Sequence, residues 1–364
     1  MILLGTITQA LLYLCFAILV GSFTLNLVPN THRPDLNVPR GALMLASGGI
    51  AILSFFPVLQ VILYLSPDIG FSQTLQSVLF TFEVGKAWMF TFILSNLLFI
   101  FVILFDYLNK TLYAYIGLAF TFIMILTLGW SSHASSYDQV WGFFSNTAHF
   151  TAVSVWVGIL FVVSWFSKNH SNWSMFLKWF TPVAIVCFVS TIITGLVLMS
   201  FVVEFDDYTN AWMFPYGQSL LIKHLLIIPL LVFATINSLL IKKKLKKDSN
   251  FNPRPWARTE SMIILLIFSA TAALGQQSPP HETTVSSTGI SKLFLLFYQG
   301  QFQPEMTVQL GLTPISIALI ILSVLFLALI ILSFIKKPPL IIPFLMSVLL
   351  VICLYLSLLL GIKS

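Results

Sequence analysis

The chain has 364 residues, of which 58% are hydrophobic and only 8% are charged, and its formal net charge is +6. A soluble globular domain carries about 25% charged residues, so this composition excludes a protein with an ordinary water-facing surface. Backbone polar groups cannot stay unpaired in lipid, which restricts the fold to helices or closed barrels. Barrel strands alternate apolar and polar residues over about ten positions, whereas the apolar runs here are continuous, as at 340–360. The sequence therefore predicts an all-α polytopic transmembrane helical bundle.

Ten apolar segments are long enough to span a bilayer, which takes about 20 residues each. The first lacks the basic start and small-residue cleavage site of a signal peptide, so we expect it to be retained. We predict a transmembrane core of eight helices over 1–276, an extracytoplasmic loop over 277–311 and two additional helices over 312–364. The predicted spans are 5–27, 41–65, 82–106, 112–131, 140–166, 176–202, 216–241, 257–276, 312–335 and 339–361.

The distribution of charge sets the expected orientation, because cytoplasmic loops are enriched in Lys and Arg. With the amino terminus outside, the inner loops and adjoining helix ends hold 14 of the 18 basic residues. The even number of spans then places both termini outside. These inner basic residues are Arg33, Arg40, Lys110, Lys168, Lys178, Lys242, Lys243, Lys244, Lys246, Lys247, Arg254, Arg258, Lys336 and Lys337.

The acidic residues follow the opposite pattern, and most of them fall in the predicted outer loops. The positive net charge is therefore a signal of topology and of contact with anionic lipid headgroups, and it does not indicate a nucleic-acid partner. No loop is long enough for a folded domain with its own core. Whatever chemistry the protein performs takes place within the lipid bilayer or at its edge.

Four of the six histidines fall in the predicted outer half of the membrane. His133 closes the fourth predicted helix, and His281 follows the Pro-Pro pair after the eighth. His149 and His224 lie eight or nine residues into their helices, at a depth of about 13 Å for a rise of 1.5 Å per residue. The other two histidines, at 32 and 170, fall in inner loops, where solvated surface is the expected role.

Imidazole is a good ligand for Cu, Zn, Fe and Ni, and thioether sulfur selects Cu(I). Met199 and Met213 lie near the outer helix ends and are candidates to supply sulfur. A single histidine inside a membrane is also often only a hydrogen-bonding residue between helices, and methionine is normally core filler. No pair has the i, i+4 spacing of a helical metal motif, so a metal site would have to be assembled from several helices.

Three charged residues near the outer face also require an explanation. Glu83 and Lys86 are three residues apart and share one helix face, which allows them to pair. Lys223 precedes His224 in the outer half, where it either extends toward water or pairs with an acidic residue such as Glu83, Glu204 or one of the 206–207 pair. A lysine beside a metal site would tune or gate it. The inner half offers only Asn96, Asn237, Arg258 and Glu260, which are poor copper ligands.

Two segments share a faint internal similarity. Phe82-Glu83-Val84-Gly85-Lys86 and Phe214-Pro215-Tyr216-Gly217-Gln218 each open a predicted helix with an aromatic-x-x-Gly turn. Transporters often contain internal repeats.

Several short motifs occur in an order that resembles the copper resistance D (CopD) family over about residues 75–285. The motifs are Thr81-x-x-x-Gly85-x-x-Trp88, Ser132-His133-Ala134, Ala148-His149, Trp156-Val157-Gly158, Thr194-Gly195, Tyr216-Gly217 with Lys223, Asn237, Arg258-x-Glu260 and Pro279-Pro280. The resemblance implies a multi-pass protein of the bacterial cytoplasmic membrane that handles Cu(I) or Cu(II). It implies that His133 and His149 are the intramembrane histidines that serve copper.

This chain lacks the fused extracytoplasmic β-domain that binds copper in several family members, so a separate donor protein is expected. The leading hypothesis is import of copper, or its transfer onward for copper homeostasis, without enzymatic activity. A related role in copper delivery to cytochrome oxidase stays open. The alternative is a membrane oxidoreductase that binds haem through paired histidines such as His149 and His224. An enzyme with a metal-activated water is disfavoured, because no Glu lies near these histidines in sequence.

Overall fold

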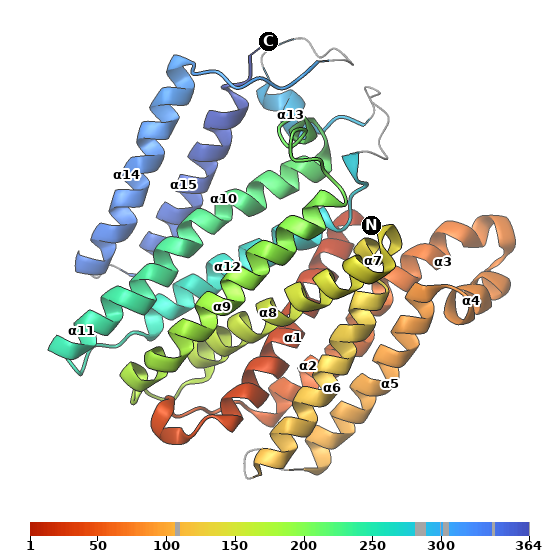
Figure 1. Ribbon diagram of the computed structural model, residues 1–364, viewed down its shortest axis with the longest axis horizontal. Coiled ribbons are helices and arrows are strands. Elements are labelled where there is room, and N and C mark those ends of the chain that lie inside the picture. Colours follow the sequence, from red (N-terminus) through yellow and green to blue (C-terminus); the bar gives the residue numbers. More distant parts are fainter. Residues whose placement is uncertain (106–109, 281–288, 299, 301–305, 337–338, 364) are drawn as a thin grey trace. The chain divides into compact units, whose positions relative to one another are not determined.

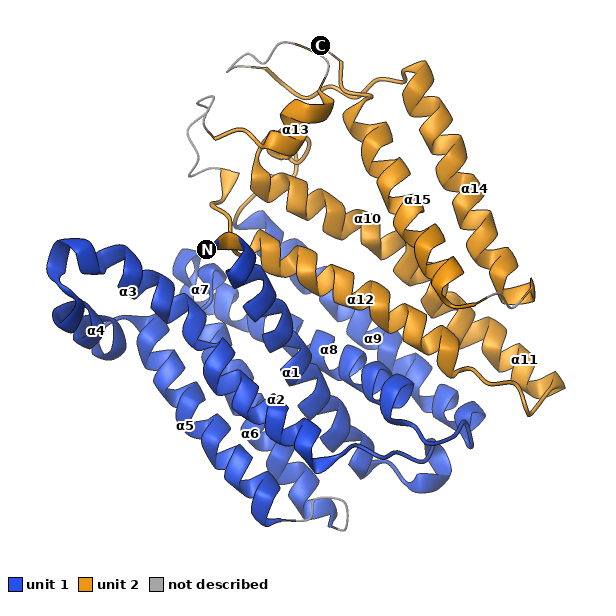
Figure 2. Ribbon diagram, turned by 180° about the vertical axis from the view of Figure 1, so that it is seen from behind, with its two compact units in different colours: residues 1, 3–201 blue, residues 2, 202–364 orange. Residues whose placement is uncertain are grey.

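The computed structural model describes residues 1–105, 110–280, 289–298, 300, 306–336 and 339–363. Within these ranges every named element is a helix, and the two antiparallel bridges, Leu36–Ser167 and Leu310–Ile362, are isolated. Ten of the described helical spans are long and apolar enough to cross a membrane, which confirms the predicted all-α polytopic bundle (Figure 1). The chain divides into two compact units, residues 1 and 3–201 and residues 2 and 202–364 (Figure 2).

Unit 1 contains the first six spans. Its elements are α1 (Ile2–Leu27), η1 (Asn30–His32), α2 (Arg40–Leu53), α3 (Phe55–Ile69), α4 (Phe71–Phe80), α5 (Glu83–Leu104), α6 (Thr111–Trp130), α7 (His133–Tyr137), α8 (Gln139–Phe166) and α9 (Trp173–Ser200).

The second span differs from its prediction because it is two helices. A break at Ser54 separates α2 from α3. Pro57 lies in the first turn of α3, where a backbone N–H would make no hydrogen bond within the helix, so proline is tolerated there. The segment expected as an outer loop is also helical. After Gly70, at φ +86°, the chain reverses into α4, and Val58, Ile62 and Val78 form a small buried core between α3 and α4.

The helices of unit 1 pack through small residues and hydroxyls. A Cβ added to Gly21 of α1 would overlap the carbonyl of Gly158 in α8, so these two backbones are in direct contact. Thr91 of α5 and Thr127 of α6 share a hydrogen bond of 2.6 Å between their hydroxyls. Without a hydrophobic drive in lipid, close backbone approach and hydrogen bonds of this kind hold transmembrane helices together.

The basic loops of unit 1 are tied together at one end. The backbone of Lys168 donates to Asp35 O, and the indole of Trp179 donates to His32 O, each at 2.8 Å. Arg40 donates to the carbonyl of Ile103 at the end of α5. We call the end of each unit that carries its basic loops the inner end, and the opposite end the outer end.

Unit 2 contains the last four spans, with a π-helical segment inside the seventh. Its elements are the 3-10 helix η2 (Asn210–Met213), α10 (Pro215–Thr235), the π-helix η3 (Ile236–Leu240), α11 (Ile241–Lys247), α12 (Arg254–Leu274), α13 (Lys292–Phe297), α14 (Pro314–Lys336) and α15 (Ile341–Leu359).

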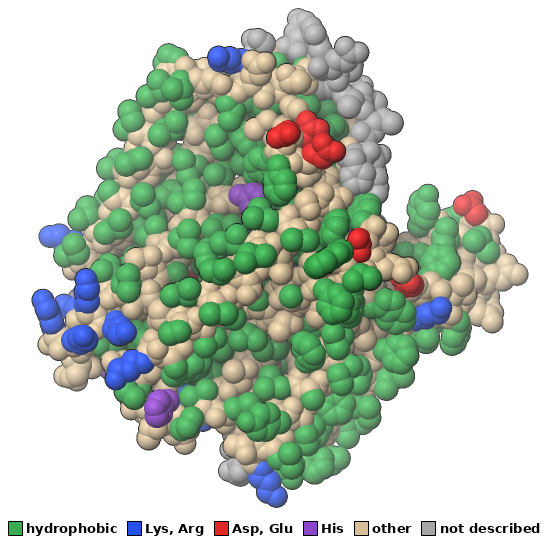
Figure 3. Space-filling view, viewed as in Figure 1, with side chains coloured by type: hydrophobic (Ala, Val, Ile, Leu, Met, Phe, Trp, Pro, Cys, Tyr) green, Lys and Arg blue, Asp and Glu red, His purple; other side chains and the backbone are tan. Residues whose placement is uncertain are grey.

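The two carboxy-terminal helices belong to the same unit as α10 and α12. Helix α14 packs along α15, and α15 in turn contacts α10 and α12. At the inner end, Phe334 of α14 packs edge-on against Trp256 of α12, with ring centroids 5.2 Å apart. In unit 2 the Lys side chains of 242–247 gather over α11, and Asp and Glu side chains lie near α13 (Figure 3). The basic end of α11 is the feature by which we define the inner end of unit 2.

The aromatic-x-x-Gly turns correspond to a repeated packing arrangement at the outer end. A Cβ on Gly85 of α5 would overlap the carbonyl of Val78 in α4, and one on Gly217 of α10 would overlap the carbonyl of Ala211 in η2. Each glycine therefore lets a short preceding helix fold back onto the start of a transmembrane helix. Gly142 of α8 makes the same contact with Ala134 of α7, which extends the arrangement to a third helix.

Candidate functional site

His149 lies on α8 with its imidazole against α9. The helix begins ten residues earlier at Gln139, so His149 is about 15 Å along α8 at 1.5 Å per residue. Its Nδ1 is 3.0 Å from the Thr194 hydroxyl oxygen. The neighbouring Gly195 also faces the ring, since a Cβ there would be 3.4 Å from His149 Cε1, an ordinary van der Waals contact. The imidazole of His149 therefore packs against the Thr194-Gly195 pair of α9.

The hydrogen bonds of Thr194 select the tautomer of His149. The Thr194 hydroxyl lies 2.6 Å from the carbonyl of Ser190, one turn earlier on α9, and donates its single proton there. It can then only accept from His149, so Nδ1 carries the ring proton and Nε2 bears the lone pair. Histidine ligands in metal sites are oriented in this way, with one ring N–H donated to a fixed oxygen and the other nitrogen toward the metal.

Trp156 lies on the same face of α8, two turns after His149. Its ring packs edge-on against Phe188 of α9, with centroids 5.7 Å apart, and its side chain is only 6% exposed. This contact holds α8 against α9 two turns farther from the outer end than Thr194. Met199 lies five residues beyond Thr194 toward the outer end of α9 and is half-buried.

His133 differs from its predicted place at the end of a transmembrane helix. Helix α6 ends at Trp130, and His133 is the first residue of the short helix α7, which is capped by the Ser132 hydroxyl. Its side chain is exposed. Because Ala134 packs against Gly142, His149 lies about 10 Å farther along α8 than this contact, at 1.5 Å per residue. The two histidines are therefore at different depths in unit 1.

His224 in unit 2 also has a hydroxyl partner. It lies nine residues after the start of α10, about 14 Å along the helix. Its Nδ1 is 2.7 Å from the Tyr208 hydroxyl, and the two rings are 5.6 Å apart. Tyr208 can donate to Nδ1 or accept from it, so both tautomers of His224 satisfy this contact. Tyr208 precedes α10 in an irregular segment, and sequence periodicity gave no signal for it.

Lys223 and Met213 flank this second histidine in sequence. Lys223 is half-buried, and the structure records no ion pair between it and the described residues Glu204, Asp206 or Asp207. Met213 ends η2 and is 5% exposed, and its carbonyl accepts from the Ser291 amide at 2.8 Å. This burial is typical of a methionine that fills space in a hydrophobic core.

A buried amide not expected from the sequence organises the outer end of unit 2. Gln218, 2% exposed, donates to the Trp212 carbonyl and accepts from the Tyr355 hydroxyl of α15. The last helix is thereby joined to the segment that carries Tyr208 and Met213. The only hint in the sequence was the polar first turn of the helix after Gly217.

The remaining predicted site residues are His281 and the pair Glu83 and Lys86. His281 lies outside the described residues. Glu83 is exposed at the start of α5 and Lys86 is half-buried, and no ion pair joins these two described residues. Among the described parts of the chain, no group of three or more His, Cys, Asp or Glu side chains is arranged to hold a metal ion. His149 belongs to unit 1 and His224 to unit 2.

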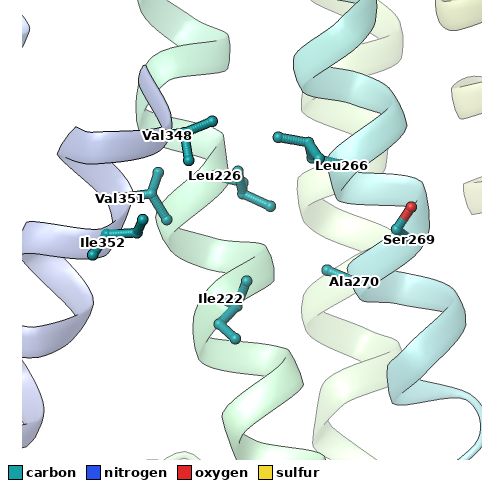
Figure 4. Close-up of a pocket in the computed structure, with 8 residues that line it drawn as sticks. All are labelled: Ile222, Leu226, Leu266, Ser269, Ala270, Val348, Val351 and Ile352. Atoms are coloured by element: carbon teal, nitrogen blue, oxygen red, sulfur yellow. The ribbon is translucent and has the colours of Figure 1, made fainter. Parts of the chain in front are cut away.

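Unit 2 also contains a cavity that is lined mainly by apolar side chains and not by possible metal ligands. It is about 300 Å³ in volume, and its lining between α10, α12 and α15 is apolar apart from one serine (Figure 4). The lining residues are Ile222, Leu226, Leu266, Ser269, Ala270, Val348, Val351 and Ile352. It offers no nitrogen or sulfur ligand, so we do not associate it with a metal.

Two family models match the chain, and both describe copper resistance protein D or a protein like it. Residues 3–143 match "Copper resistance protein D-like, N-terminal domain", and residues 174–274 match "Copper resistance protein D". The chain belongs to the copper resistance D family. The matches begin at residue 3, so the copper resistance D region includes the first two spans, which the motifs did not cover. Helices α14 and α15 lie beyond both matches.

A curated relative of this copper resistance D protein is "Copper transport protein CutJ" of Bacillus subtilis (strain 168). The two are 25% identical over 292 residues, which is 75% of this chain and 52% of the relative. The chain thus spans about half the length of that relative. No solved structure matches the chain significantly. Family membership and the ten spans establish a copper-related multi-pass membrane protein.

Proposed function

We propose that this protein takes up a copper ion at its outer end through His149 and carries it inward or passes it on. The observation that carries the proposal is the 3.0 Å contact between His149 Nδ1 and the Thr194 hydroxyl. While that hydroxyl donates to Ser190 O, the imidazole donates through Nδ1 and carries its lone pair on Nε2. Copper is the cargo here and not a resident cofactor. A neutral imidazole in a fixed orientation suits either oxidation state of copper.

His133 and His149 would act in sequence. His133 is exposed at the start of α7, where it can accept copper from water or from a donor protein. His149 lies deeper, between α8 and α9. Met199, near the outer end of α9, would offer a sulfur ligand on the way, which favours Cu(I). A separate extracytoplasmic donor and the cytoplasmic membrane of a bacterium fit this arrangement, and we propose no enzymatic activity.

The same features support His224 as a second ligand position in unit 2. When Tyr208 accepts from Nδ1, His224 Nε2 also bears a lone pair. Lys223 would then place a positive charge one residue from the copper ligand and favour release of the ion. His281 stays a predicted ligand outside the described residues.

Elemental analysis of purified protein in lipid tests the proposal. We expect bound copper in wild type, loss of most of it in His149→Ala, and slower loading from a copper donor in His133→Ala. His32→Ala is the matched control, because His32 is an exposed loop histidine at the inner end. Full copper occupancy in His149→Ala would reject the site. A haem absorption band in the same preparation would instead support the oxidoreductase alternative.

A further inference from the structure

Glu260 and Asn237 form a buried polar pair near the inner end of unit 2. Glu260 lies six residues into α12, about 9 Å from its inner end at 1.5 Å per residue. The Asn237 amide donates to Glu260 Oε2 at 2.6 Å and to the Trp256 carbonyl at 3.2 Å. The two side chains are only 3% and 8% exposed. The proposed copper site does not use either residue.

No ion pair is recorded between Glu260 and the charged groups that the structure describes on the surrounding elements. On α12 itself the charged residues are Arg254 and Arg258, and α11 carries the lysines of 242–247. Helix α10 offers Lys223 and His224 in its outer half, and α15 offers the weak acids Cys353 and Tyr355. Within the described residues, Asn237 is the recorded partner of Glu260. A buried carboxylate paired only with a neutral amide is unfavourable, and such a group takes up a proton instead.

The side-chain amide of Asn237 has an acceptor that could receive a hydrogen bond from a protonated Glu260. Both hydrogen bonds of Asn237 come from its nitrogen, and its buried Oδ1 has no donor in the described structure. A carboxyl and an amide that face each other form two hydrogen bonds when the carboxyl is protonated, one in each direction. Protonation of Glu260 would add an O–H donor to this pair, in which Asn237 Oδ1 is the buried acceptor without a donor.

The backbone around Asn237 is also unusual. Asn237 lies in the π-helix η3, between α10 and α11. Such segments are rare and occur frequently at functional sites. Lys242, in the basic end of α11, follows five residues later, about 8 Å along the axis. The path from inner water to the pair is therefore short.

We propose that Glu260 is a proton-binding site that exchanges with the inner aqueous side, and that Asn237 is the residue that positions its carboxyl. The step is a reversible protonation of the carboxylate, with the proton taken from and returned to water. The inference goes beyond the proposed copper chemistry, since proton binding here requires no metal.

Infrared difference spectroscopy of the full chain in lipid vesicles, titrated with pH in the absence of copper, tests this. We expect a carboxylic acid band in wild type that disappears as pH rises, is absent from Glu260→Gln and is retained in Glu83→Gln. Asn237→Leu should shift its midpoint, because the amide N–H donates to the ionised carboxylate and the amide oxygen is an acceptor for the protonated carboxyl; an unchanged midpoint would show that Asn237 does not position the carboxyl. If Glu260→Gln does not fold, labelling with 13C-glutamate shows that the band arises from a glutamic acid, and its displacement in Asn237→Leu assigns it to Glu260.

Two results would overturn the inference. One is a Glu260 carboxylate that stays ionised over the whole titration. The other is an acid band that persists unchanged to alkaline pH, which would mark a permanently neutral structural group. Since no copper is present, either result leaves the proposed copper site untouched.

Discussion

The imidazole of His149 and the hydroxyl of Thr194 lie 3.0 Å apart across the contact between α8 and α9. When the same hydroxyl donates to Ser190 O, it can only accept from His149, which favours the tautomer with the ring proton on Nδ1. A side chain of α9 thus orients a side chain of α8, and the copper site proposed at His149 predicts that a change at Thr194 weakens copper binding without altering the histidine itself.

Thr194→Val should weaken copper binding by about 10–100-fold, the usual effect of removing the hydrogen-bond partner of a metal-binding histidine. Valine keeps the shape of threonine but offers no acceptor to Nδ1. Thr194→Ser should retain wild-type affinity, since its hydroxyl can make the same bonds. Competition titration against a copper chelator measures the effect. Equal affinities for the valine and serine variants would contradict the tautomer argument.

Copper removal should lower the thermal stability of wild type. A ligand that binds only the folded state stabilises it by about 2.7 kcal/mol at 100 times its Kd. We therefore expect the melting temperature to fall when a chelator strips the ion, and to rise again on reloading. His149→Ala should show little response to either treatment. A variant that responds as wild type does would place the stabilising copper elsewhere.

Gly158→Ala should destabilise unit 1, because α1 lies directly against this glycine. The added methyl would collide with the Ala17 carbonyl and with the Gly21 backbone. Overpacking of this kind costs about 1–3 kcal/mol. Gly41→Ala is the matched control, since no atom lies within 4 Å of its added Cβ. Thermal unfolding in detergent, monitored by size-exclusion chromatography, should give a lower melting temperature for Gly158→Ala than for Gly41→Ala.

Gln218→Leu should destabilise the outer end of unit 2. It removes the acceptor of the Tyr355 hydroxyl and the donor to the Trp212 carbonyl. Each buried group left without a partner costs about 1–3 kcal/mol. Adding Tyr355→Phe to the first change should restore part of the loss, because it removes one of the unsatisfied groups. A purely additive double variant would show that the two side chains do not interact.

Tyr208 should ionise at higher pH than an exposed tyrosine. Burial raises the pKa of its phenol above the ordinary value, which is about 10. Between the two values the folded protein holds a proton that the unfolded chain has lost, so this group lowers stability as pH rises through about 10. The phenolate absorbance of Tyr208, measured as the ultraviolet difference between wild type and Tyr208→Phe, should therefore appear at higher pH in the folded protein than in the unfolded protein. The reverse order would contradict the burial of Tyr208.

The histidines show which features of the candidate site could be predicted from the sequence and which could not. His149 was predicted as a ligand from its depth in an apolar helix, but its partner Thr194 is 45 residues away in the chain. Tyr208 lies in an irregular segment, where no periodicity marks a residue for contact with His224. His133 was expected at the end of a transmembrane helix, yet its exposure depends on the chain turning at Ser131 into the short helix α7. These contacts arise from helix packing and turn geometry, which local patterns do not encode.

Apolar segment length and the distribution of charge were sufficient to determine the ten spans, the helical class and the expected orientation. The physical reason is that lipid requires each span to satisfy its own backbone and each basic loop to stay in water, and both requirements are local. Only the tertiary structure decided that α3 and α4 form a hairpin, that α15 joins α10 through Gln218, and that Thr194 orients His149. Those features depend on which helix faces meet, and that is settled by glycine contacts and buried hydrogen bonds between residues far apart in the chain.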